Sequence, residues 1–234
     1  MNAVPHILVA DTVFRSLDWG ETARAHMAVG AIAPDAYRII AGLSFRDLHF
    51  RGRRGSKVQL RDFADTYVIP ALARGQGDEQ AFWAGWYCHL VSDRVWRRML
   101  RTELPDLWQA VTSGDREERA RVRDGYQAAC DRVDVQLADA PGSTVAELRW
   151  LLRSWQPGYE LGLVKASQMR EWVVQVGSNA MPPPEPTLVG RTDVDFAFVQ
   201  RAIAAAQQQL AKDMANLARQ ADESPDFDGP FAQV

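Results

Sequence analysis

Apolar residues recur about every three to four positions along most of the chain, which is the period of an amphipathic helix. No segment shows the alternation of apolar and polar residues that is typical of a half-buried strand. We therefore predict an all-α fold, a single-domain helical bundle of roughly seven to nine helices. The expected helices span residues 5–17, 20–29, 58–74, 81–101, 105–112, 115–138, 145–155, 161–176 and 193–221.

Glycine and proline mark the expected breaks between these helices. The segment GAIAPD at 30–35 should interrupt the helical pattern, because the residue before a proline is pushed out of the helical region. Asp35 would then lie near the start of the next helix. The segment SFRDLHFRGRRGSK at 44–57 is expected to be a loop that carries His49. Pro70 should kink or shorten the helix at 58–74.

The proline-rich stretch MPPPEP opens a predicted linker at residues 181–192. We expect residues 1–180 to form one helical domain that contains the metal site inferred below. The helix at 193–221 should pack on the same domain, and residues 222–234 should form a flexible acidic tail.

The predicted helix at 81–101 carries His89 and Asp93 on one face, because residues four positions apart lie one above the other on a helix. Phe82, Trp86 and Trp96 share this face, so it should be buried. A buried imidazole and carboxylate need partners. A metal ion is one such partner, since neutral imidazole and ionised carboxylate both ligate zinc and similar cations. The alternative is a hydrogen-bonded pair that serves only the structure.

Composition narrows the classes of partner and compartment. The formal net charge is -3, so no overall basic field indicates a nucleic-acid partner. No apolar run approaches the roughly 18–20 residues of a membrane span. Cys88 and Cys130 lie far apart in helical segments, which predicts free thiols and a reducing compartment. The start, MNAVPHILVADTVF, lacks the basic region of a signal peptide, so we expect a cytoplasmic protein.

Three segments together resemble the zinc-dependent phospholipase C family: GAIAPD at 30–35, HF at 49–50 and FWAGWYCHLVSDRVW at 82–96. The resemblance covers about residues 5–100. It implies the all-α fold of phospholipase C and P1 nuclease, which binds metal ions in a cleft between helices. It also implies Asp35, His49, His89 and Asp93 as the ligands of one ion. His6 would serve a neighbouring ion, with Asp93 placed to bridge the two.

The chain departs from this family in its later ligands. The secreted enzymes hold three metals and use two later histidines and a glutamate, whereas no histidine follows His89 here. We therefore expect one ion, or two that share Asp93. Zinc is the first candidate, and iron or manganese are alternatives. His6 could instead be an exposed first-turn residue. His26 has no counterpart in the family and is expected at the surface or in ordinary packing.

The segment at 46–57 is a local concentration of positive charge, with five basic residues and one acidic residue. Arginine forks suit phosphate and other planar anions. Arg51, Arg53 and Arg54 are therefore the candidate substrate-binding residues, although a solvated charged loop would have the same composition. Asp47 could orient the imidazole of His49, or it could equally point into solvent.

These residues favour a metal-dependent hydrolase that acts on a phosphoester or another small anionic molecule through a metal-bound water. Asp35 and Asp93 would be its catalytic residues. A second hypothesis is a specialised biosynthetic lyase or cyclase on the same fold, in which Asp and His perform acid–base chemistry. A third is a non-catalytic protein with a structural metal or none.

Overall fold

The computed structural model describes residues 2–17, 19–51, 58–75, 77–112, 115–156, 163–178 and 194–223. Within these residues the fold is all-α, as predicted, and the only β-type pairing is an isolated bridge between Arg51 and Val58. The α-helices are α1 (Ala3–Phe14), α2 (Glu21–Ile32), α3 (Phe45–Leu48), α4 (Leu60–Phe63), α5 (Ile69–Arg74), α6 (Gly77–Glu103), α7 (Pro105–Thr112), α8 (Arg116–Asp139), α9 (Val145–Ser154), α10 (Ala166–Gly177) and α11 (Phe196–Asp222).

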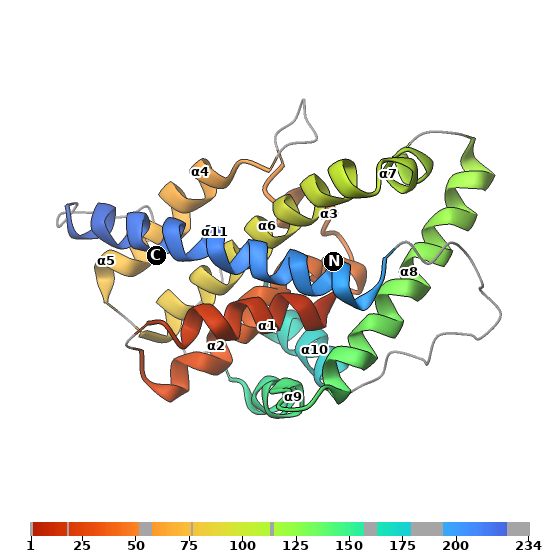
Figure 1. Cartoon of the computed structure of the whole chain (residues 1–234). Coiled ribbons are helices and arrows are strands. Elements are labelled where there is room, and N and C mark those ends of the chain that lie inside the picture. The colour runs from red at the N-terminus through yellow and green to blue at the C-terminus, as the bar shows by residue number, and fades with distance from the viewer. Residues whose placement is uncertain are drawn as a thin grey trace.

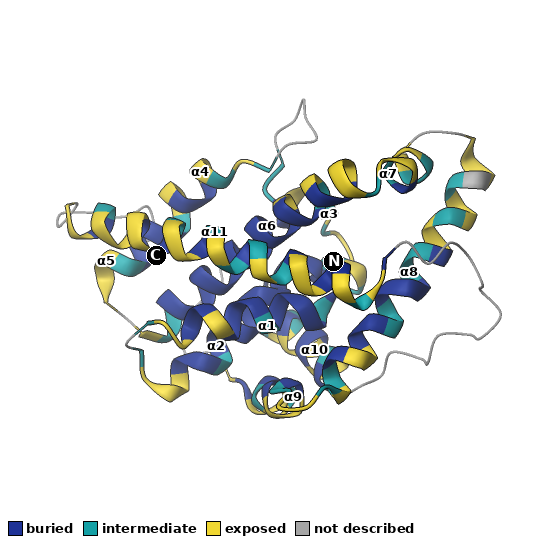
Figure 2. Ribbon diagram, viewed as in Figure 1, coloured by how far each residue is buried: buried dark blue, intermediate teal, exposed yellow. Residues whose placement is uncertain are grey.

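Helix α6 is the central element of the bundle. It is the helix predicted around His89, extended at both ends to 27 residues, and most of its side chains are buried (Figure 2). Helix α11 runs along α1 and also contacts α5 and α6 (Figure 1). Helices α9 and α10 pack on each other, and they contact α2 and the segment that follows it. The predicted linker at 181–192 and the tail from residue 224 lie outside the described residues.

Helices α2 and α6 make the most extensive contact between any two described elements. Two glycines permit it, one on each helix. A Cβ at Gly30 would lie 2.0 Å from the carbonyl oxygen of Phe82, and one at Gly85 would lie 2.1 Å from that of Met27. The α-helix therefore ends within the predicted segment 30–35, but three residues later than the predicted end at residue 29. The helix continues to Ile32, because Gly30 serves close backbone packing rather than a turn.

After α2 the chain continues as a narrower type of helix. Residues Ala33–Arg38 form a 3-10 segment, η1, with Pro34 near its start, where a missing backbone N–H costs nothing. Asp35 lies in this segment and is buried. Its predicted position near a helix start is thus confirmed, although the helix is a short one.

The predicted loop at 44–57 contains the four-residue helix α3. Ser44 and Asp47 form a capping box: the Ser44 hydroxyl accepts the Asp47 N–H, and the Asp47 carboxylate accepts the Ser44 N–H. Asp47 therefore takes part in the N-terminal cap of α3. The prediction that it orients His49 is wrong.

The helix predicted at 58–74 is divided by a π-helical segment, η2 (Ala64–Val68), which lies between α4 and α5. Pro70 lies two residues after the end of this segment, in the first turn of α5. A proline clashes with the preceding turn of an α-helix and lacks the N–H that would bond to it, so a local change of helix type accommodates it.

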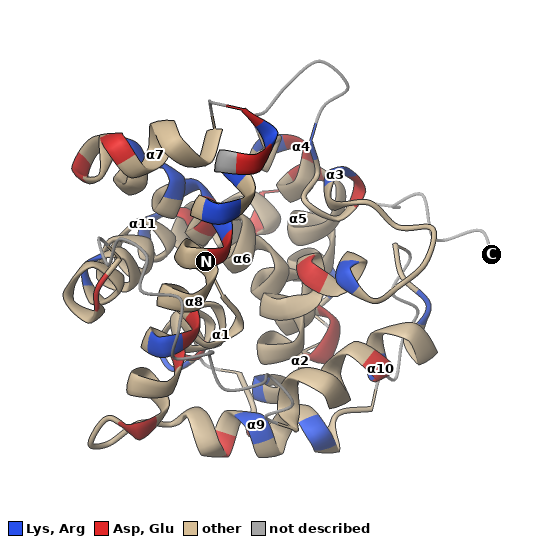
Figure 3. Ribbon diagram, turned by 90° about the vertical axis from the view of Figure 1, so that its right-hand side faces the viewer, with Lys and Arg blue, Asp and Glu red and all other residues tan. Residues whose placement is uncertain are grey.

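Acidic and basic residues are interspersed along the helices (Figure 3). Across the described part of the chain, no helix has both the length and the apolar character that a membrane crossing requires. The described cysteines, Cys88 and Cys130, are both free and buried, which agrees with the expectation from their spacing.

Candidate metal centre

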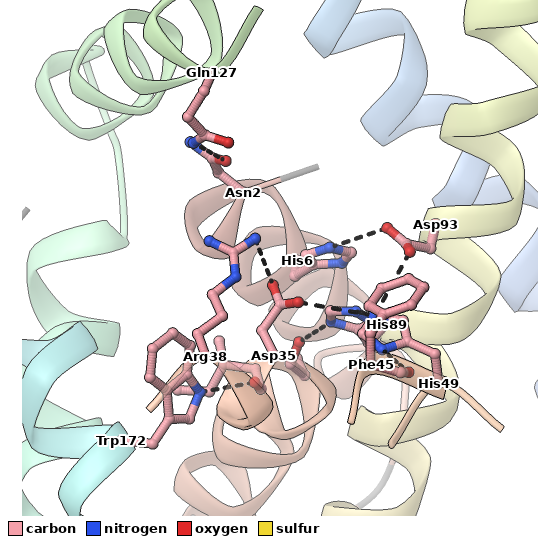
Figure 4. A network of polar contacts seen from close by, with 12 residues as sticks. Asn2, His6, Asp35, Arg38, Phe45, His49, His89, Asp93, Gln127 and Trp172 are labelled. Atoms are coloured by element: carbon pink, nitrogen blue, oxygen red, sulfur yellow. Dashed lines mark hydrogen bonds and ion pairs between the residues drawn. The ribbon is translucent and has the colours of Figure 1, made fainter. Parts of the chain in front are cut away.

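The structure brings all five predicted ligands together in one buried cluster (Figure 4). His6 comes from α1, Asp35 from η1, His49 from the residue after α3, and His89 and Asp93 from α6. None of the five is more than 7% exposed. Two overlapping groups have ligand atoms close enough to share an ion: His6, His89 and Asp93, and Asp35, His49 and His89.

Backbone carbonyl groups orient two of the imidazoles. The Nδ1–H of His89 donates to the carbonyl oxygen of Ala31 at 2.8 Å, and the Nδ1–H of His49 donates to that of Phe45 at 3.1 Å. A carbonyl oxygen only accepts, so the proton of each neutral ring must lie on Nδ1. The Nε2 atoms therefore present lone pairs to each other, and they are 3.1 Å apart. Two facing lone pairs at this distance are matched by a cation between or beside them.

His6 has no hydrogen-bond partner among the described residues, although both of its ring nitrogens are buried. Its ring stacks on that of His89, with centroids 3.8 Å apart. Its Nε2 lies 3.7 Å from Oδ1 of Asp93, which is beyond hydrogen-bond distance. An unsatisfied buried nitrogen costs free energy, and a bound ion would satisfy it. His6 is 1% exposed, so the alternative that it is an exposed first-turn residue is wrong.

The carboxylates stand around His49 at similar distances. Its Nε2 lies 3.8 Å from Oδ1 of Asp35 and 3.7 Å from Oδ2 of Asp93. These separations are long for hydrogen bonds. They resemble the spacing of about 3.4 Å between neighbouring ligand atoms of a tetrahedral zinc ion with bonds of about 2.1 Å. The donor set and its spacing therefore fit a metal ion.

The environment favours the neutral form of two of the imidazoles, those of His6 and His49. Burial lowers the pKa of His49 to about 2, and the nearby His89 ring adds to the effect. The pKa of His6 is also lowered well below its ordinary value, again mainly by burial and then by His89. Neutral imidazole is the form that ligates metals, so the fold prepares these rings for that role.

Two buried tryptophans hold the backbone next to the ligands. The indole N–H of Trp86 donates to the carbonyl oxygen of Leu48, directly before His49, at 3.1 Å. That of Trp172 donates to the carbonyl oxygen of Ile32, at the end of α2 and just before η1, at 2.8 Å. Each indole satisfies a carbonyl at a helix end. These hydrogen bonds also hold the backbone that leads to His49 and to Asp35 in place.

Arginines near the cluster were not all found from the sequence. Arg97 donates to Oδ2 of Asp93 at 2.9 Å, and Arg38 lies 3.6 Å from Oδ2 of Asp35. Both stand one helical turn after their carboxylate, so the i,i+4 and i,i+3 spacing could have indicated them. Among the predicted substrate-binding residues, Arg51 lies with its guanidinium carbon 4.7 Å from the centre of the Phe45 ring. Arg53 and Arg54 lie outside the described residues.

His26 lies apart from this cluster. Its Nδ1 accepts the indole N–H of Trp155 at 3.0 Å, and its Nε2 lies 3.5 Å from Asp78. This agrees with the expectation of ordinary packing. The other three histidines of the chain all belong to the cluster.

A pocket of about 420 Å3 reaches the cluster, and Asp35, His49 and Asp93 are among the residues that line it. Its remaining walls come from η1, α3, α6, α7 and α8. Small-molecule sites are commonly cavities of this size with a few convergent polar groups, so a ligand could reach the cluster by this route.

No family model matches the chain, and no curated protein or solved structure matches it significantly. The resemblance to zinc-dependent phospholipase C therefore stays a prediction, and the chemistry of the site rests on its geometry.

Proposed function

We propose that the cluster binds one or two metal ions and that the protein is a metal-dependent hydrolase of a phosphoester or another small anionic molecule. The observation that carries this proposal is the pair of Nε2 lone pairs of His49 and His89, 3.1 Å apart. The unpartnered nitrogens of His6 add to it. Zinc suits a set of neutral imidazoles and carboxylates, and iron or manganese are alternatives.

Asp35, His49, His89 and Asp93 would hold the first ion, with His6 beside Asp93 for a neighbouring one. A metal ion with an open position lowers the pKa of a bound water and polarises a phosphoryl oxygen. Asp93 directs one oxygen toward His6 and the other toward His49 and Arg97, so it could bridge two ions. Arg51 and Arg97 flank the Phe45 ring next to the cluster and would bind the negative charge of the substrate.

A second candidate function needs no metal. The ion pairs from Arg38 to Asp35 and from Arg97 to Asp93 neutralise both carboxylates with the chain's own cations. Such a site could act as a lyase or cyclase in which a carboxylate or a neutral imidazole accepts a proton from the substrate. This observation favours acid–base chemistry over hydrolysis.

Metal analysis separates the two candidates. We expect protein purified without chelator to contain about one or two equivalents of zinc, iron or manganese per chain. His89→Gln and Asp93→Asn should each remove most of this metal, because each deletes a ligand. Asp134→Asn is the matched control, since Asp134 is also a buried aspartate but belongs to α8, outside the cluster. Metal-free wild-type protein would contradict the proposal.

Turnover then separates a catalytic metal from a structural one. We expect the metal-loaded protein to hydrolyse bis(4-nitrophenyl) phosphate or 4-nitrophenyl phosphate, and Asp93→Asn to lose this activity while it keeps its helical circular dichroism. Loss of fold in Asp93→Asn would favour a structural site. Metal without any phosphoester turnover would overturn the hydrolase assignment.

A further inference from the structure

The pocket that reaches the cluster has an aromatic wall. Phe45 from α3, Trp96 from α6, Trp108 from α7 and Tyr126 from α8 all line it. With Tyr37 from η1, five elements contribute aromatic rings to this cavity. Aromatic rings bind other rings through offset and edge-to-face contacts, in addition to the gain from removing apolar surface from water.

The polar ends of two of these rings are already paired with each other. The indole N–H of Trp96 donates to the Tyr126 hydroxyl oxygen at 2.6 Å. The edge of Trp96 also packs on Phe198 of α11, with centroids 5.1 Å apart, which fixes the indole in place. A ligand would therefore meet the ring surfaces of this pair rather than a free hydrogen-bonding group.

Two arginines add positive charge to this pocket. Arg97 donates to Asp93 at 2.9 Å, and its guanidinium carbon lies 5.6 Å from the centre of the Phe45 ring. It therefore contacts both the cluster and the aromatic wall. Arg123 lines the same pocket from α8, one turn before Tyr126, and its side chain is exposed. The pocket therefore carries a guanidinium group from each of two helices, α6 and α8.

We propose that this pocket binds a small anion that carries an aromatic ring. The anionic group would lie at the His/Asp cluster beside Arg97, and the ring would lie among Phe45, Trp96, Trp108 and Tyr126. This inference rests on the proposed function, because it names the substrate class of the same site. Arg123 is assigned to substrate binding, and Trp108 to the selection of the ring.

Phosphonates of matched charge test the pocket without turnover. Isothermal titration calorimetry would compare phenylphosphonate, butylphosphonate and methylphosphonate on the purified full-length chain. We expect phenylphosphonate to bind at least about tenfold more tightly than methylphosphonate. This is the gain in affinity from burying one face of its phenyl ring. Butylphosphonate should lie between them. Equal affinities, no binding, or butylphosphonate as tight as phenylphosphonate would overturn the inference.

Two variants assign the roles. Trp108→Leu keeps an apolar side chain on α7 and should reduce the preference for phenylphosphonate by about fivefold or more, with methylphosphonate affinity and metal content unchanged. Arg123→Gln, at an exposed position, should weaken both phosphonates by a similar factor of about tenfold. Trp150→Leu, at a 59% exposed tryptophan of α9, is the control and should change neither. An unchanged preference in Trp108→Leu would overturn the assigned wall.

The outcome is independent of the hydrolase test. If phenylphosphonate binds selectively to protein that carries no metal, the pocket assignment holds and the proposed hydrolysis fails. If the protein carries metal and hydrolyses phosphoesters but binds the three phosphonates equally, the proposed function holds and the aromatic substrate class fails.

Discussion

At the scale of single residues, the orientation of the His49 and His89 imidazoles follows from the partners of their Nδ1 atoms. The carbonyl groups of Ala31 and Phe45 fix the tautomers of His89 and His49, so both Nε2 atoms are directed into the cluster. The same kind of second contact orients metal-bound histidines in general. The i,i+4 spacing of His89 and Asp93 was sufficient to predict their common face. The backbone partners could not be predicted, because they depend on how α2 and α3 pack against α6.

Asp134 is a second buried acid, and it lies outside the cluster. It is 5% exposed, and its Oδ2 has no hydrogen-bond partner among the described residues. Burial, followed by repulsion from Asp131, raises its pKa from 3.8 to about 7. Because the folded state holds this proton more tightly than the unfolded state, the stability it contributes is present at low pH. That stability is lost as the pH rises from about 4 to about 7.

Asp134→Asn should therefore stabilise the protein more at pH 8 than at pH 5. The asparagine stays neutral, whereas Asp134 must ionise in its buried position above pH 7. The difference in unfolding free energy between variant and wild type should grow by about 2–3 kcal/mol between the two pH values. Urea unfolding at pH 5 and pH 8 measures it, with Asp106→Asn on the exposed surface of α7 as the control. An equal effect at both pH values would contradict the raised pKa.

At the scale of elements, the contact between α2 and α6 positions the site, because the bond from His89 to Ala31 crosses it. Gly30 and Gly85 permit the close approach. A glycine in a helical pattern predicts a break or a close contact equally well. The sequence alone could not decide between them, so α2 runs three residues beyond its predicted end at residue 29. The capping box of Ser44 and Asp47 could have indicated α3 from the sequence. It was missed because the charged residues and glycines that follow it favoured a loop.

Gly85→Ala should destabilise the fold by about 3 kcal/mol or more, because the new Cβ would overlap backbone that cannot move alone. It would lie 2.1 Å from the carbonyl oxygen of Met27. The helices must separate, so the bond from His89 to Ala31 should lengthen and the metal content should fall. Gly77→Ala, on the same helix with nothing within 4 Å of the added Cβ, is the control. Thermal unfolding and metal analysis read out both effects. Equal behaviour of the two variants would show that the helices can adjust.

At the scale of the whole molecule, the all-α class and most helix positions could be predicted from periodicity, because the helices bury one face each. The pocket could not. Its walls come from η1, α3, α6, α7 and α8, which are up to about ninety residues apart in the sequence. Phe45, Trp96, Trp108 and Tyr126 are spaced like ordinary core residues within their own helices. Their common cavity exists only once the helices are assembled.

The ligands of the cluster also come from distant parts of the bundle, so a bound ion would join α1, η1, α3 and α6. An ion that binds only the folded state stabilises it by mass action, by about 2.7 kcal/mol at a free concentration of 100 times Kd. For a chain of this length this corresponds to an increase in Tm of about 5–10 °C. Chelation with EDTA should lower the Tm of the purified protein by that amount, and added zinc should restore it. Asp93→Asn, which lacks the shared carboxylate, should show little response to either treatment. A wild-type Tm that is insensitive to EDTA, or an equal response in Asp93→Asn, would mean that the five side chains do not join these elements through a metal.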